Sequence, residues 1–181
     1  MPSATTAMRL APTIARLWQW LAEVPDPEIP VLSVVDLGIV RDVAWSDRDD
    51  ECVVTVTPTY SGCPATEVIR QQIIESLRAH GVENPKVHLQ LSPAWTTDWM
   101  TPEARDKLRG YGIAPPIRSV GSTEHVVDIT RLRRTALTPD VPCPRCGSAH
   151  TELVGQFGST PCKSLHRCKD CREPFDHFKR H

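Results

Sequence analysis

Two pairs of cysteines in the second half of the 181-residue chain have the spacing of a metal site. Cys143 with Cys146 and Cys168 with Cys171 form two C-x-x-C knuckles, separated by residues 147–167. Four thiolates on two tight turns can complete a tetrahedron around Zn²⁺, and a segment of about 40 residues rarely folds without such a metal. The all-cysteine ligand set predicts a closed structural zinc site. Iron in a rubredoxin-like site or in a cluster is the alternative.

A fifth cysteine lies at a turn between a predicted strand and a predicted helix. The sequence Gly62-Cys63-Pro64 places proline at the first helical position, which proline favours, and makes Cys63 the N-cap. There the thiol would face unpaired N–H groups and the positive end of the helix dipole. Both favour a thiolate that can act as a nucleophile or bind a soft metal. The turn chemistry equally allows a small, buried capping cysteine.

Three further side chains are candidates for related chemistry. Asp26 and Glu28 lie in a two-proline turn and could act as acid–base groups or hard metal ligands near Cys63, although aspartate before proline is also ordinary turn chemistry. Cys162, next to a lysine, is either a second functional thiol or a buried residue of the loop between the knuckles. The sequence has no phosphate-binding glycine loop and no H-x-x-x-H pair, so kinase and metalloprotease functions lack support.

The apolar pattern before the knuckles predicts a small α+β domain. Its predicted elements are a helix over 14–21, strands over 39–45 and 52–57, a helix from Pro64, and a strand over 86–91. This α-β-β-α-β order predicts a small sheet with helices on one face, followed by a small β-rich zinc-ribbon domain. Cys52 lies on the same face of the second predicted strand as Val54 and Val56 and is expected in the core.

A segment with two tryptophans, Trp95 and Trp99, joins these parts. They could be anchors for a partner protein, or additional core, because large aromatic side chains bury much area. We expect an α/β domain over 12–92, an aromatic arm and linker over 93–117, and a connector and ribbon over 118–181 with its metal core at 141–181. A further strand could lie at His125–Ile129.

The composition indicates a soluble, cytoplasmic protein. No apolar run approaches the ~20 residues that span a bilayer, and the first residues have no signal-peptide pattern. The net charge of −1 argues against a whole-chain grip on nucleic acid or membrane. Residues 141–181 are mildly basic but have no dense basic stripe, so a protein partner is favoured over nucleic acid. The seven cysteines are expected as metal ligands, reactive thiols or core residues rather than disulfides.

Several motifs together resemble known families. Over residues 12–92, the stretches DPEI (26–29), LGIV (37–40) and GCP (62–64) are similar to the DUF59-type domain of iron–sulfur assembly proteins. The rest resembles the PaaD family of phenylacetate degradation, the D subunit associated with the phenylacetyl-CoA epoxidase. That resemblance rests on PAWTTDWM (93–100), GIAPP (112–116), FGSTPCK (157–163) and FDHFK (175–179).

The resemblance implies an accessory role, without catalysis by this chain itself, in an epoxidase whose oxygenase carries a di-iron centre and whose reductase carries flavin and an iron–sulfur cluster. It assigns the reactive cysteine to Cys63, the acidic turn to Asp26 and Glu28, and the ribbon ligands to the four knuckle cysteines. We expect transient iron or an Fe–S cluster to pass through Cys63 to an oxygenase or reductase subunit, with the Fe–S assembly machinery as a further partner. The alternatives are a structural subunit of the epoxidase and a zinc-ribbon nucleic-acid binder.

Overall fold

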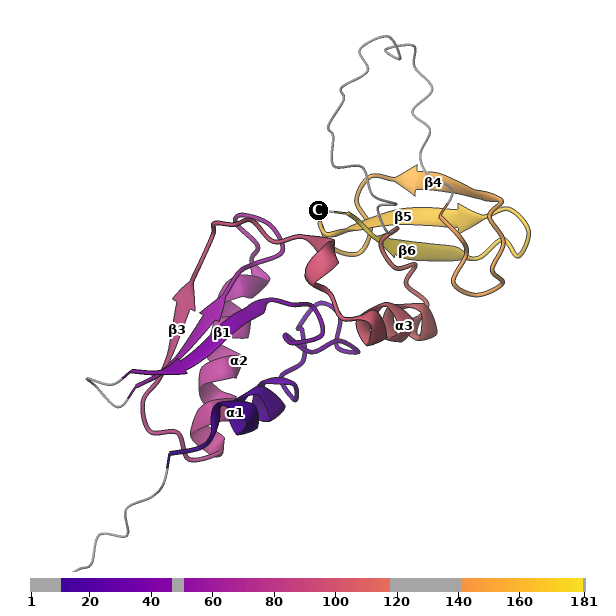
Figure 1. Cartoon of the computed structure of the whole chain (residues 1–181). Coiled ribbons are helices and arrows are strands. Elements are labelled where there is room, and N and C mark those ends of the chain that lie inside the picture. The colour runs from indigo at the N-terminus through magenta and orange to yellow at the C-terminus, as the bar shows by residue number, and fades with distance from the viewer. Residues whose placement is uncertain (1–10, 47–50, 118–140, 181) are drawn as a thin grey trace, which may run out of the picture. The chain divides into compact units, whose positions relative to one another are not determined.

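The computed structural model describes residues 11–46, 51–117 and 141–180. They divide into two compact units, with the boundary between Pro93 and Ala94 (Figure 1). The strand expected at His125–Ile129 lies outside the described residues. Each unit has its own sheet.

The first unit is a three-stranded sheet with two helices packed on it. Its elements are α1 (Ile14–Leu21), β1 (Val40–Trp45), β2 (Cys52–Val56), α2 (Ala65–Ala79) and β3 (Pro85–Leu89). The central strand β2 pairs with β1 in antiparallel and with β3 in parallel fashion. Helix α2 packs against β3, and α1 packs against α2 and β1. The predicted α-β-β-α-β order and the α+β class are confirmed.

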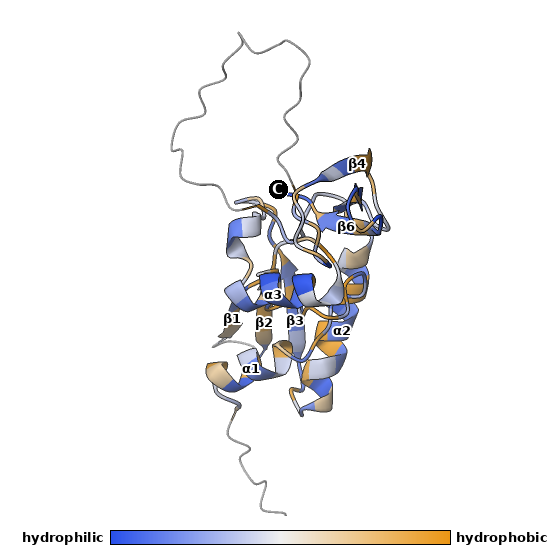
Figure 2. Ribbon diagram, turned by 90° about the vertical axis from the view of Figure 1, so that its right-hand side faces the viewer, coloured by the Kyte–Doolittle hydropathy of each residue, from blue (hydrophilic) through white to orange (hydrophobic). Residues whose placement is uncertain are grey.

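The core of this unit lies between β2 and the helices. Every second residue of β2 is buried, beginning with the fully buried Cys52, whose predicted place in the core is confirmed. Helix α2 contributes Ile69, Ile73 and Leu77 at four-residue steps, each worth about 1.5–3 kcal/mol when fully buried. Figure 2 shows β2 in apolar colours and β3 largely in polar ones, in line with the greater exposure of β3.

The first strand departs from simple alternation. A β-bulge between Val40 and Asp42 shifts the register of β1 against β2. Val40 and Val43 are consequently both buried, whereas Trp45 is only half-buried. The alternation expected from Ile39 through Val43 to Trp45 could not show this, because the extra residue of a bulge changes which side chains face the core.

Helix α1 lies where the sequence predicts it, and its buried side chains begin at its fourth residue. Ile14 is 39% exposed, and the buried set is Leu17, Trp20 and Leu21. Trp20 stacks on His80, with ring centroids 4.4 Å apart. No helix in the described residues is both long and apolar enough to cross a membrane.

The second unit is an antiparallel sheet with a helical arm. Its elements are η1 (Thr97–Trp99), α3 (Pro102–Tyr111), β4 (Thr151–Gly155), β5 (Lys163–Cys168) and β6 (Pro174–Phe178), with strand order β4-β5-β6. After α3, Ala114 joins the edge of β6: its N–H donates to Asp176 O (2.8 Å) and its O accepts from Phe178 N–H (2.9 Å). Trp95 is 4% exposed and packs edge-on against Phe178. Trp95 is therefore core of the second unit, and its interpretation as a partner anchor is wrong.

Candidate functional site

The four knuckle cysteines of the second unit converge on one point. The Sγ atoms of Cys143 and Cys171 lie 3.8 Å apart, and those of Cys146 and Cys168 lie 3.6 Å apart. All four lie within 4.8 Å of one another. A tetrahedral ion with metal–sulfur bonds of about 2.3 Å separates its ligands by about 3.8 Å. The donors therefore fit one tetrahedral metal ion, and this spacing suits zinc and iron alike.

The two knuckles are each followed by a residue in the left-handed backbone conformation. Gly147 follows the first pair with a φ of 76°, and Arg172 follows the second with a φ of 65°. Backbone N–H groups in the second knuckle lower the pKa of Cys168 to about 6, and the N–H of Cys171 has the largest effect. An N–H that points at sulfur stabilises the charged form, which is the form that binds a metal.

Polar contacts outside the sulfur atoms join the two knuckles. Ser148 Oγ donates a hydrogen bond to Asp170, and His150 Nδ1 lies 3.2 Å from Asp170 Oδ1. These contacts lower the pKa of Asp170, and the hydrogen bond from Ser148 has the largest effect. Lys169 N–H also donates to His150 O at 2.8 Å. Behind the sulfur atoms lies a small buried cluster of Ala114, Val141, Cys143, Cys168 and Phe175.

Removal of the metal is expected to unfold the ribbon and to leave the first unit intact. The buried cluster at the knuckles has only five residues, two of them ligands, so the free energy of metal binding should supply much of the folding free energy of the ribbon. In hydrogen-exchange mass spectrometry of the full chain, chelation or Cys143→Ala should abolish protection of β4–β6 and preserve that of β1–β3.

Cys162→Ala is the matched control for this prediction, because Cys162 is a buried ribbon cysteine outside the cluster. It should keep one metal per chain. A Cys143→Ala ribbon that stays protected and metal-free would contradict a structural role for the metal.

Cys63 lies apart from this cluster, in the loop between β2 and α2 of the first unit. Its side chain is half-buried. Its N–H donates to Tyr60 O (3.3 Å), and its O accepts from Thr66 N–H (3.1 Å). Helix α2 begins at Ala65 with Pro64 as N-cap, so the prediction of Cys63 as N-cap is wrong by one residue. The fixed φ of proline suits both positions, and the sequence could not distinguish them.

The acidic turn is organised by Asp26. This side chain is 7% exposed, and its Oδ1 accepts the N–H groups of Glu28 (2.9 Å) and Ile29 (2.7 Å). Glu28 is half-buried. In the part of the chain that the structure describes, the four knuckle cysteines are the one group of three or more candidate ligands within 4.8 Å of one another. Cys63, Asp26 and Glu28 therefore do not form a preassembled three-ligand site.

Replacement of Asp26 should show a structural role. Asp26→Ala leaves two backbone N–H groups without their acceptor and should lower the free energy of unfolding by about 1–3 kcal/mol. Asp26→Asn keeps an acceptor oxygen and should cost clearly less. Urea unfolding of both variants measures the difference. Equal losses would mean that the negative charge, not the acceptor, is what the turn needs.

Two other cysteines are enclosed. Cys162 is 4% exposed, and its Sγ lies 3.0 Å from Thr160 Oγ1, in agreement with a buried residue of the loop. Burial raises the pKa of Cys52 to about 11. Neither thiol is open to an incoming reagent or metal in the folded chain.

Alkylation should consequently be selective. In the metal-loaded native chain, iodoacetamide should modify Cys63 first, and Cys52 and Cys162 only after unfolding. Peptide mapping by mass spectrometry at successive times gives the order. Labelling of Cys52 as fast as Cys63 would show that the burial of the core does not control access.

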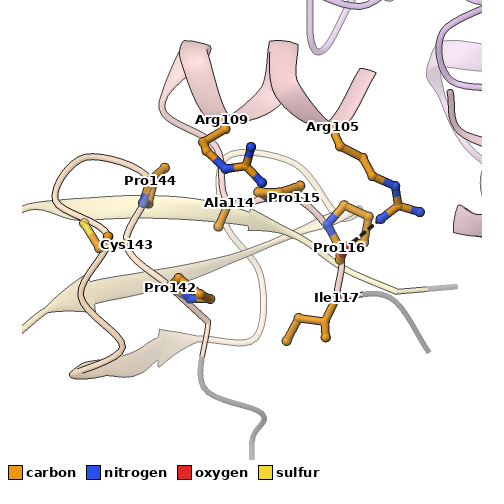
Figure 3. A pocket seen from close by; sticks show the side chains of 10 residues that line it. Arg105, Arg109, Ala114, Pro115, Pro116, Ile117, Pro142, Cys143 and Pro144 are labelled. Carbon is orange, nitrogen blue, oxygen red and sulfur yellow. Dashed lines mark hydrogen bonds between the residues drawn. The ribbon is translucent and has the colours of Figure 1, made fainter. Parts of the chain in front are cut away.

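A cavity of about 450 Å³ lies in the second unit beside the first knuckle. Figure 3 shows Arg105 and Arg109 of α3 on one side of it and Pro142, Cys143 and Pro144 on the other. The guanidinium of Arg105 donates to Pro116 O (2.8 Å) and Thr97 O (2.9 Å), so it holds the chain after α3 in place. The described lining residues include no carboxylate or imidazole, and the cavity therefore offers no general acid–base pair.

Two buried polar features were not predicted from the sequence. Thr57, at the end of β2, is 1% exposed, and its hydroxyl has no hydrogen-bond partner among the described residues. A buried hydroxyl left unpaired costs about 1–3 kcal/mol and marks a place for a water or a ligand. In the ribbon, Lys163 is 4% exposed beside Asp176. Alternation from the buried Cys52 would place Thr57 on the opposite face of its strand, and no local pattern predicts a buried lysine.

Each of the two units matches a known protein-family model. Residues 14–89 match the family model described as an iron–sulfur cluster assembly protein, and residues 129–179 match that of the PaaD zinc beta ribbon domain. The fold and the cysteine cluster thus define a protein that joins an iron–sulfur assembly domain of DUF59 type to a metal-binding ribbon.

Individual proteins of similar sequence identify the family within this class. The putative D subunit of the 1,2-phenylacetyl-CoA epoxidase of Escherichia coli K12 is 51% identical over 168 residues, 93% of each chain. The Fe-S protein maturation auxiliary factor YitW of Bacillus subtilis is 36% identical over 89 residues, 49% of this chain and 85% of that one. A crystal structure of a DUF59 domain from Bacillus anthracis is 30% identical, with a TM-score of 0.47, and covers 52% of this chain and 89% of that one. The chain belongs to the PaaD family of phenylacetyl-CoA epoxidase D subunits.

Proposed function

We propose that this chain is a non-catalytic maturation factor of a phenylacetyl-CoA epoxidase, which delivers iron or an Fe–S unit to a client protein through Cys63. The clients would be the oxygenase component, the reductase component or both. Iron is the cargo in this proposal and not a resident cofactor. The Fe–S assembly machinery would supply it.

The relatives support both halves of the proposal. The name of the E. coli relative connects the family to the epoxidase, and that of the B. subtilis relative connects the first unit to Fe–S protein maturation. The family model of the iron–sulfur assembly protein matches residues 14–89. Cys63 lies inside that region, and the knuckle cysteines lie outside it.

The observation that carries the proposal is the contrast between the two kinds of cysteine site. The four knuckle sulfurs enclose one tetrahedral position and leave no ligand site open. Cys63 is half-buried and stands alone in a loop ahead of a helix. A cargo held by one protein sulfur is weakly bound, and a client thiolate or carboxylate can replace that sulfur by ligand exchange without a change in oxidation state.

We assign the ribbon metal as zinc. Zinc has no redox chemistry and is the usual ion of closed Cys₄ sites, and the matching family model describes a zinc ribbon. In this assignment the metal folds the ribbon and takes no part in delivery. Metal analysis of the purified chain should give one zinc per chain. A red preparation with iron in the ribbon would contradict the assignment of zinc.

The rival function is a structural subunit that remains in the epoxidase complex. The name of the E. coli relative, which calls that protein a subunit, favours it. Such a subunit should co-purify at fixed stoichiometry and tolerate replacement of Cys63. A maturation factor should act substoichiometrically and should not.

The test is the iron content and activity of the oxygenase and reductase components, produced with this chain, without it, and with its Cys63→Ser variant. Omission of the chain should give iron-poor, inactive components. Cys63→Ser should do the same, because serine keeps the shape of the side chain and removes the soft ligand. Iron with a reductant should restore them. Ser61→Ala, an exposed change in the same loop, is the control and should behave as the wild type.

Fully metallated components in all three preparations would rule out delivery through Cys63. If omission lowers activity and Cys63→Ser does not, the structural-subunit function is the better one.

A further inference from the structure

A single aromatic side chain stands out on the surface of the ribbon. Phe157, in the loop between β4 and β5, is 70% exposed, more than any other large apolar residue in the described parts of the chain. Lys179 Nζ lies 4.4 Å from the centroid of its ring and 3.4 Å from Gln156 O. The cation thus contacts both the ring and the loop backbone, and these contacts favour the observed position of the phenyl group.

An ion pair between the buried Lys163 and the partly exposed Asp176 ties down the residues that follow Phe157. Asp176 accepts hydrogen bonds from Ser159, at 2.6 Å from Oγ and 3.4 Å from N. Lys163 Nζ lies 3.7 Å from Asp176 Oδ2, and the Lys163 side chain is 5% exposed. Lys163 O in turn accepts the N–H of Gly158 at 2.8 Å. The loop is therefore tied to β5 and β6 by charged and backbone groups together.

Gly158 belongs to the same arrangement. A Cβ added at this position would overlap Asp176 Oδ1 and would also lie 3.3 Å from Asp176 Cγ. The carboxylate thus occupies the space that any other residue would need. Glycine is required here by the close approach of Asp176 and not by the local backbone angles.

The stability of the ribbon does not explain this network. Removing a lysine and an aspartate from water costs several kcal/mol per ion, and apolar residues of similar size often do as well. What the pair supplies is a defined loop conformation, with Phe157 displayed. An exposed aromatic group whose position is already fixed loses little entropy when a partner covers it, which is the property of a binding anchor.

We propose that Phe157 is the anchor by which the ribbon docks onto a client protein, and that Lys163, Asp176 and Gly158 position it. The partner that fits is a protein with an apolar pocket bordered by carboxylates, because the ring is flanked by Lys179 and residues 141–181 carry seven Lys and Arg against four Asp and Glu. The identification of the client as an epoxidase component rests on the proposed function. The anchor itself does not depend on Cys63.

The test is the affinity of the metal-loaded full chain for the purified oxygenase and reductase components, measured by isothermal titration calorimetry. The wild type should bind one of them, and Phe157→Ala should raise Kd by about tenfold or more. Tyr111→Ala is the matched control: Tyr111 is an exposed aromatic of the same unit, at 58%, and its removal should change Kd less than about twofold. Metal content confirms that each variant is folded.

Gly158→Ala tests the positioning network while Phe157 stays in the chain. The added methyl group must displace Asp176, so binding should weaken although metal content is unchanged. Cys63→Ser should bind as the wild type does, which separates docking from delivery. A wild-type chain that binds a client but does not deliver iron to it would contradict the proposed function only.

Three results would overturn the anchor. The first is that Phe157→Ala binds every component as tightly as the wild type does. The second is that the wild type binds neither component. The third is a loss of self-association in Phe157→Ala by analytical ultracentrifugation without any effect on client binding, which would make Phe157 a contact between copies of this chain. Wild-type binding by Gly158→Ala would remove the positioning role.

Discussion

The four converging sulfur atoms are the feature on which we expect the ribbon of the second unit to depend, through the cation that they can bind. Cys143 and Cys146 come from one turn and Cys168 and Cys171 from another, and their Sγ atoms are 3.6–3.8 Å apart across the turns. Charged thiolates at that distance repel one another unless a metal lies between them. We therefore expect a metal ion bound there to decide whether the small core behind it, the β4-β5-β6 sheet and the loop that carries Phe157 form.

The first unit needs no such constraint, because its sheet and helices enclose an ordinary apolar core. Its cysteines therefore have other uses. Cys52 is fully buried and part of that core, and Cys63 is half-buried in a loop. One chain thus combines sulfur that is committed to folding with sulfur that remains accessible. In the proposed function, the ribbon recognises the client, and the loop before α2 carries the cargo.

The sequence predicted the features that depend on neighbours in the chain. Knuckle spacing predicted the four-sulfur cluster, and helical and alternating patterns predicted α2 and β2. Features set by contacts between distant segments could not be predicted. The bulge at Val40, where β1 pairs with β2, shifted one strand, whereas the turn role of Asp26, a local one, was among the two roles expected. The ion pair of Lys163 and Asp176 joins residues 13 positions apart, between which no local pattern exists.

Direct transfer of iron tests the central claim of delivery through Cys63. The chain would be loaded with ⁵⁵Fe or a reconstituted cluster, mixed with metal-free oxygenase or reductase, and separated from it, and the iron on the client would be counted over time. We predict that the wild type loads the client faster than the same amount of free iron does, and that Cys63→Ser gives no gain over free iron. Equal transfer by the wild type and by Cys63→Ser would contradict the account.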